Sequence, residues 1–165
     1  MTIRPYRPAD LDALYAINQA STPGVGHEDS AQGLARWLSL GTCLVAVDES
    51  DAALGFINLI ETGVQAYESA NLRWFEDYVA RTGRDLIYVD RIAIAAAARD
   101  QGLGEQLYRA AFEHFSNRDE IGCEVNTAPP NPGSHRFHQR LGFEEVGTRT
   151  YQDGAKAVAF YARPL

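Results

Sequence analysis

The sequence predicts an α/β (α+β) fold in which a mixed, mostly antiparallel central sheet is flanked by helices. Short apolar runs rich in β-branched residues are interspersed with longer segments whose apolar residues recur every three to four positions. Strand-like runs near both ends of the chain are joined in pairs by short polar turns, which is typical of antiparallel hairpins. Regular alternation of strand and helix is absent, which argues against a doubly wound nucleotide-binding fold.

The strands are predicted from apolar runs that end at polar or glycine-containing turns. In order, they are residues 2–4, 43–47, 54–60, 86–94, 121–126, 144–150 and 155–162. The polar run 48–51 joins two of them into a hairpin, and the turn at Asp153 and Gly154 joins the last two.

The helices are predicted from apolar residues that share one face at the helical period. In order, they are residues 10–20, 30–40, 71–81, 103–115 and 134–141. Asp10 is a suitable N-cap for the first helix, and Gly83 is a suitable stop after the third. The segment 62–85 is longer than a hairpin connection, so we expect an inserted helical segment that acts as a lid or binding element. In the alternative interpretation, its helix only docks on the core.

Length and composition favour one domain covering residues 1–165. The formal charge of −7 argues against a nucleic-acid partner, because binding to nucleic acid relies on basic patches. No apolar run approaches a membrane span or a signal peptide, so no membrane partner is expected and the expected location is cytoplasmic. Cys43 and Cys123 have neither a disulfide pattern nor metal-ligand spacing, so no metal is expected. Assembly into a homodimer is left open.

A glycine-containing corner follows the expected strand 86–94 and leads into the helix at 103–115. A strand, a glycine loop and a helix N-terminus together direct unpaired N–H groups and the positive end of a helix dipole at one point. Arg99 adds a positive charge there, and Gly102 and Gly104 allow a ligand close to the backbone. The pattern indicates a site for a phosphorylated ligand; a tight turn without a ligand is the alternative.

This order of elements, with Arg99-x-x-Gly102-x-Gly104 after the fourth strand, resembles the GNAT superfamily of acyl-CoA-dependent N-acetyltransferases. A second matching signature runs from Asn131 through Ser134, Phe137 and His138 to Leu141-Gly142-Phe143. The resemblance covers about the C-terminal half of the chain. It implies a sheet splayed between strands four and five, and acetyl-CoA as co-substrate without a metal.

In the family, the loop amides hold the pyrophosphate of the cofactor, and the main chain before them pairs with the pantetheine arm. The residues that the resemblance assigns to the cofactor are Ile92, Ala93, Ile94, Arg99, Asp100, Gln101, Gly102, Leu103, Gly104, Asn131, Ser134, Phe137 and His138. Three positions depart from the family pattern. Asp100 replaces a common glycine and must point outward, Ala96 replaces a common proline, and His138 replaces a common tyrosine.

The implied reaction is attack of an amine on the acetyl thioester, for which a base must first deprotonate the ammonium group. Strand alternation is expected to place Tyr88, Asp90 and Ile92 on one face, so Asp90 and Tyr88 become catalytic candidates. A β-bulge near Asp90 to Ile92 is expected to separate the strands and to direct an N–H at the thioester oxygen. His138 is the candidate acid for the departing thiolate, or at least a hydrogen-bond partner of its sulfur. The structural alternatives are a salt bridge or turn cap for Asp90, a core position for Tyr88, and a surface or core position for His138.

The acceptor is expected to contact Glu61, Tyr67, Trp74 and Asn126. Glu61 ends the third strand, Tyr67 and Trp74 belong to the inserted segment, and Asn126 shares a face of the fifth strand with Glu124. A solvated loop carboxylate is the alternative for Glu61. We therefore predict transfer of an acetyl group from acetyl-CoA to a primary amine of a small molecule or peptide. A non-catalytic acyl-CoA-binding or sensor protein of the same fold is the alternative.

Overall fold

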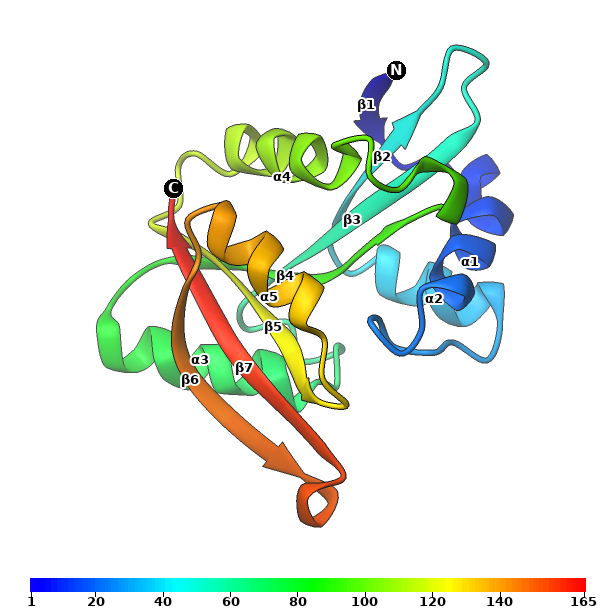
Figure 1. Cartoon of the computed structure of the whole chain (residues 1–165). Helices are drawn as coiled ribbons and strands as arrows, with labels where there is room; N and C mark the ends of the chain where they lie inside the picture. Colours follow the sequence, from blue (N-terminus) through cyan, green and yellow to red (C-terminus); the bar gives the residue numbers. More distant parts are fainter.

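The computed structural model describes residues 1–165 and contains one seven-stranded sheet with five α-helices against it (Figure 1). The strands are β1 Thr2–Pro5, β2 Thr42–Val47, β3 Ala53–Glu61, β4 Leu86–Ile94, β5 Glu120–Ala128, β6 Glu144–Tyr151 and β7 Lys156–Pro164. The α-helices are α1 Leu11–Ala20, α2 Ala31–Leu38, α3 Ala70–Thr82, α4 Leu103–His114 and α5 Pro132–Arg140. Every element predicted from the sequence is therefore present, with ends shifted by at most two residues.

The order of strands in the sheet is β1-β2-β3-β4-β5-β7-β6, and every neighbouring pair except β4–β5 is antiparallel. Helices α4 and α5 cover one face, where Leu107 and Tyr108 pack on residues of β3, β4 and β5. Helices α1, α2 and α3 cover the other face, as the packing of Leu14, Leu34 and Phe75 shows. The predicted fold class is confirmed. None of the helices has the length and apolar character needed to cross a membrane.

Strands β4 and β5 pair only at their beginnings. Their parallel ladder runs from the pair Leu86–Glu120 to the pair Tyr88–Gly122 and then stops. From Val89 to Ile94, β4 remains paired with β3 but has no partner on the β5 side. The predicted splay between strands four and five is thus confirmed, and it leaves an opening in the middle of the sheet.

A β-bulge lies at Asp90. Its neighbours Val89 and Arg91 pair with the adjacent residues Leu59 and Asn58 of β3, so Asp90 is one residue too many on β4. An extra residue shifts the alternation of side chains, because the period of a strand is two.

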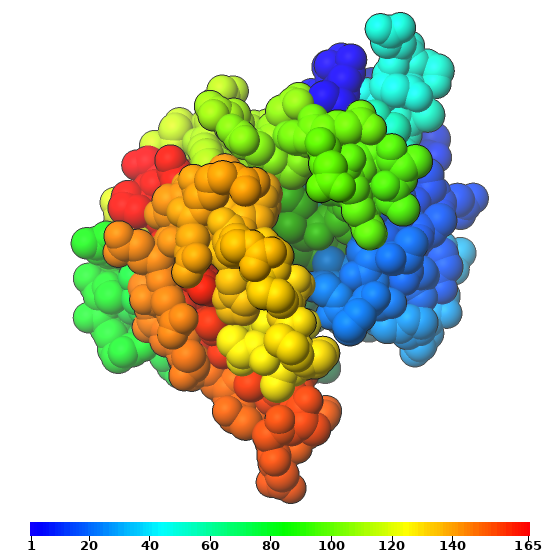
Figure 2. Space-filling view, in the orientation of Figure 1, coloured from blue at the N-terminus to red at the C-terminus, as the bar shows by residue number.

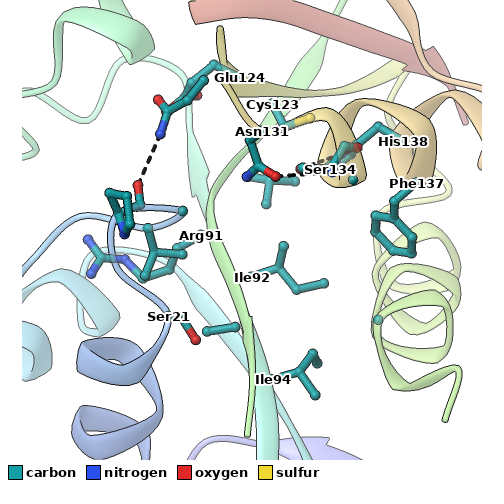
Figure 3. Close-up of a pocket in the computed structure, with 18 of the residues that line it drawn as sticks. Ser21, Arg91, Ile92, Ile94, Cys123, Glu124, Asn131, Ser134, Phe137 and His138 are labelled. Atoms are coloured by element: carbon teal, nitrogen blue, oxygen red, sulfur yellow. Dashed lines mark hydrogen bonds between the residues drawn. The ribbon is translucent and has the colours of Figure 1, made fainter. Parts of the chain in front are cut away.

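The expectation that Tyr88, Asp90 and Ile92 share one face is therefore wrong. Tyr88 packs on the α3 side of the sheet, whereas Ile92 and Ile94 pack on the α4 side. Figure 3 shows Ile92 and Ile94 pointing toward Phe137 and Arg91 pointing the opposite way. The bulge itself was predicted, but its effect on the face of each side chain was not.

Candidate active site

A large cleft opens where β4 and β5 separate, with a volume of about 880 Å³. Its wall is formed by the unpaired part of β4, the loop before α4, the α1–α2 connection, β5 and α5. In Figure 2 the surface is hollowed between the green segment that leads into α4, the blue α1–α2 connection and the yellow-to-orange α5. Most of the residues assigned to the cofactor line this cleft: Ile92, Ala93, Ile94, Arg99, Asp100, Gly102, Leu103, Gly104, Asn131, Ser134, Phe137 and His138.

The loop before α4 presents a row of free backbone N–H groups. Those of residues 100 to 105 find no acceptor within the chain, and the first intrahelical bond is from Gln106 N–H to the Gly102 carbonyl. These donors lie at the positive end of the α4 dipole, which favours an anion. Asp100 is exposed, as its position in the loop requires, and Arg99 lies back against the Ile94 carbonyl and Ser21. The loop therefore fits the phosphate groups of a cofactor.

The two glycines of the loop are required for different reasons. Gly102 precedes α4 in a left-handed conformation, with φ of +75°, and a Cβ there would meet no other atom. Gly104 has no such conformation, but a Cβ there would lie 3.1 Å from Cζ of Phe137. Gly104 therefore allows α5 to pack closely on the start of α4, and it acts through Phe137 as well as through access to the backbone. Gln101 bonds the Ala97 carbonyl and is outside the cleft.

Helix α5 forms another wall of the cleft. Asn131 caps this helix, because its Oδ1 accepts a hydrogen bond from the Ser134 N–H at 3.3 Å (Figure 3). The amide nitrogen of Asn131 is not used by the cap and lies near Gly24 of the α1–α2 connection. Asn131 therefore keeps a donor for a ligand in the cleft.

His138 does not have the surroundings of an acid. Its ring is 3% exposed, its Nδ1 donates to the Ser134 carbonyl at 2.8 Å, and its Nε2 accepts from the Tyr108 hydroxyl at 2.8 Å. Burial lowers its pKa to about 4, so the imidazole is neutral at physiological pH. The expected proton donation by His138 is thus contradicted, because both nitrogens are occupied and the ring carries no extra proton. The structural alternative describes it better.

A second, smaller cavity of about 470 Å³ adjoins the cleft from the α1–α2–α3 side of the sheet. Asp90, Arg91 and Glu124 line both cavities. The outer wall is aromatic and consists of Trp37, Tyr67 and Tyr151. The two cavities therefore meet at the bulge, one on each face of the opening in the sheet. We call the second cavity the acceptor pocket.

Asp90 is tied into a network at the meeting point of the two cavities. Its carboxylate accepts hydrogen bonds from Asn58, Tyr67 and Arg91, and its side chain is 2% exposed. The Arg91 guanidinium lies 2.7 Å from Asp90 and 2.9 Å from Glu28, and it also donates to Asn18. The salt-bridge interpretation of Asp90 is therefore correct. A carboxylate so fully engaged is a poor candidate for a base.

Glu124 of β5 has the properties that Asp90 lacks. Its oxygens lie 2.9 and 2.8 Å from the Tyr88 hydroxyl, and Asn71 donates to Oε1 at 2.9 Å. Burial raises its pKa to about 7, although the bonds from Tyr88 and Asn71 act in the opposite direction. A pKa near the working pH is what general-base catalysis requires. Tyr88 therefore takes part in the site by donating a hydrogen bond to Glu124. Burial raises the pKa of the Tyr88 hydroxyl.

The structure divides the four expected acceptor residues. Tyr67 lines the acceptor pocket, and Asn126 lines the cleft and donates to the Pro23 carbonyl across its mouth. Glu61 is instead paired with Arg118 at 2.6 Å, away from both cavities. Trp74 stacks on Phe160 with ring centroids 3.9 Å apart and packs against β6. The expectations for Glu61 and Trp74 are therefore wrong: the first has an ion-pair partner and the second belongs to the core.

Three residues of the site were missed: Arg91, Tyr108 and Glu124. One sequence feature pointed to Glu124: the alternation of β5 places it on the same face as Asn126, which was expected to contact the acceptor. Arg91 is a charged residue in an apolar strand, next to the disfavoured Asp90, and this pairing was a usable signal. Nothing in the sequence indicated that Tyr108 bonds His138.

The family is shown by comparison with known proteins. Residues 11–143 match the model of the acetyltransferase (GNAT) family, and the chain belongs to this family. The class of enzyme predicted from the sequence, an N-acetyltransferase, is confirmed at this level.

Named relatives in the family act on different amines. A glucosamine 6-phosphate N-acetyltransferase 1 from rice, Oryza sativa subsp. japonica, is 30% identical over 87% of this chain and 81% of its own length. An aminoglycoside N(6')-acetyltransferase type 1 from Salmonella typhimurium is 27% identical over 88% and 93%. A phosphinothricin N-acetyltransferase from Streptomyces coelicolor is 34% identical over 45% of the chain, which spans under half of that enzyme.

Solved structures share the fold. A phosphinothricin acetyltransferase from Sinorhizobium meliloti, in complex with acetyl-CoA, superposes with a TM-score of 0.73 over 99% of this chain and 88% of its own, at 23% identity. That degree of likeness establishes the arrangement of the sheet and helices.

Proposed function

We propose that the protein transfers an acetyl group from acetyl-CoA to a primary amine that enters through the acceptor pocket. The observation that carries this proposal is the opening between β4 and β5, which joins the cleft to the acceptor pocket beside Glu124. The pyrophosphate of acetyl-CoA binds the free N–H groups of residues 100–105, and the pantetheine arm runs along the unpaired edge of Ile92–Ile94. The thioester then lies at the bulge.

Glu124 is the base in this proposal. It removes a proton from the ammonium group of the acceptor, directly or through one water molecule, and the free amine attacks the thioester carbonyl. The unpaired main chain at the bulge supplies N–H groups for the negative oxygen that forms. When the C–S bond breaks, the second nitrogen proton passes to the departing thiolate. A thiol with a pKa of about 8.5 leaves readily, so a dedicated acid contributes little.

The test is thiol release from acetyl-CoA with a panel of amines, combined with calorimetry of acetyl-CoA binding. Gly102→Val forces a side chain into a left-handed position in the loop and should weaken acetyl-CoA binding by at least about tenfold. Gly83→Val is the matched control, because Gly83 has φ of +69°, ends α3 and also has open space around it. Equal binding of acetyl-CoA by both variants would contradict the assignment of the loop.

A non-catalytic acyl-CoA-binding protein is the alternative function, and the same experiment separates the two. Such a protein binds acetyl-CoA tightly but releases no thiol with any amine. The position of Glu124, buried against Tyr88 and open to both cavities, supports the enzyme, since a sensor does not need a base between two pockets.

A further inference from the structure

The acceptor pocket contains one buried cation, Arg91, whose side chain is 5% exposed. In a pocket for a small molecule, a buried guanidinium is the ordinary partner of a carboxylate or a phosphate on the ligand. In this chain it already has two partners of its own. Asp90 accepts from Nε and Nη2, and Glu28 lies 2.9 Å from Nη1.

The second of these partners is set in place by its own contacts. Glu28 belongs to the connection between α1 and α2, its side chain is 12% exposed, and its other oxygen accepts from Trp37 Nε1 at 3.0 Å. Asn18 fills the remaining space at Nη1, at 3.0 Å. Asp90 alone offsets the charge of Arg91, so Glu28 gives this side of the pocket an excess of one negative charge.

The rest of the pocket adds no buried anion site. Its outer wall is formed by aromatic faces, which attract ammonium groups. Glu68 is exposed at the rim, and Lys156 is the other cation there, also exposed. From this arrangement we infer that Glu28 determines acceptor specificity: by occupying Arg91, it excludes amines that carry a carboxylate or phosphate and favours amines whose second group is neutral or cationic.

This inference rests on the proposed function, since it concerns the pocket through which the acceptor amine enters. It predicts an order among three acceptors with the same primary amine and chain length. These are 1,6-diaminohexane, hexylamine and 6-aminohexanoate, whose far ends are positive, neutral and negative. The diamine and hexylamine should bind more tightly than 6-aminohexanoate to the protein saturated with CoA.

The decisive variant is Glu28→Gln, which keeps the shape and the bond to Trp37 but releases Arg91 from one of its two carboxylates. The affinity for 6-aminohexanoate, relative to that for 1,6-diaminohexane, should rise by about tenfold or more. Asp29→Asn is the matched control: it removes the same charge from the adjacent residue, whose side chain is fully exposed and does not contact Arg91. Glu28→Asp keeps the charge and should keep the wild-type order.

Calorimetry of binding to the CoA complex and thiol release from acetyl-CoA are measured separately. The inference is overturned if 6-aminohexanoate binds the wild type as well as the diamine does, if none of the three compounds binds, or if Glu28→Gln and Asp29→Asn shift the order equally. If Glu28→Gln fails to fold, the order of affinities for the three amines in the wild type and in Glu28→Asp decides whether the inference holds. Charge-ordered binding without thiol release would support this inference and contradict acetyl transfer, so the two failures are distinguishable.

Discussion

Replacing Glu124 by glutamine tests the proposed base, because the change removes the charge but keeps the shape. Turnover at pH 8 should fall by a factor of about 10² to 10⁴, the usual contribution of a general base. Acetyl-CoA affinity should change little, since Glu124 lies at the end of the cleft and the loop at residues 100–105 is intact. The wild-type rate should rise with pH and level off above about 7, the pKa to which burial raises this carboxyl.

The same variant should lose activity but gain stability above about pH 7, because burial disfavours the charged form of Glu124. The pKa of Glu124 rises from 4.5 to about 7 on folding, so the folded protein binds more protons than the unfolded chain between these values. Stability is therefore unaffected below pH 4.5 and decreases as pH rises through this window. The loss is about 2 to 3 kcal/mol above pH 7, at 1.36 kcal/mol per pKa unit and allowing for the solvent that reaches the cleft.

Glu124→Gln should therefore be more stable than the wild type at pH 8 and about equally stable at pH 4.5. Urea unfolding at the two pH values measures this difference. Glu105→Gln serves as a control, because Glu105 lies at the start of α4 and pairs only with Arg109. A variant that is slower but has the wild-type pH profile and stability would show that the reasoning about Glu124 is wrong.

Three further predictions concern His138 and Asp90, which were first expected to be catalytic. The double variant His138→Phe with Tyr108→Phe should retain kcat within about fivefold, because His138 is neutral and bonded on both nitrogens; a loss of a hundredfold would restore an acid role. The pKa of His138 is lowered by burial from 6.5 to about 4, so wild-type stability should fall as pH decreases through this range, and unfolding curves of the double variant should not show that fall. Asp90→Asn leaves Arg91 paired with Glu28 but removes the charged acceptor of the bonds from Asn58 and Tyr67, so it should cost about 1 to 3 kcal/mol in urea unfolding. The KM for the amine should rise and the KM for acetyl-CoA should not change; the reverse pattern would argue against this prediction.

Sequence patterns located the glycine loop and the strand edge that line the cleft, because local chain features create them. The strand 86–94, the glycine loop and the helix after it follow one another directly, and their periodicity and glycines are visible in one stretch of sequence. The bulge was also expected, because the family resemblance implies that strands four and five splay apart and a bulge near Asp90 to Ile92 separates them. One local prediction was wrong. Asp10 was expected to cap α1, but its side chain accepts hydrogen bonds from Arg4 and from the Arg7 N–H instead.

The acceptor side could not be located in the same way, because it depends on contacts between distant segments. Glu124 is raised in pKa by burial among residues of α3, β4 and β5, and no local pattern reports that burial. The sequence predicted that Trp74 lines the pocket, but the indole ring packs against Gly147 of β6, where a Cβ would collide with it. Charge and aromatic content identify candidates, but only the register of the sheet decides which cavity they face.

The bulge at Asp90 connects these two levels. If β4 paired regularly through Asp90, with no bulge, Arg91 would point to the α4 side with Val89 and would place a charge among the apolar residues of the main core. With it, Asp90 and Arg91 both face the acceptor pocket and neutralise each other, while Ile92 and Ile94 return to the cofactor side. In the proposed function, a single inserted residue thus separates an apolar wall for the pantetheine arm from a polar wall for the amine. The proposed reaction places the thioester where these two walls meet, so the bulge and the end of the β4–β5 ladder together set the place of that reaction.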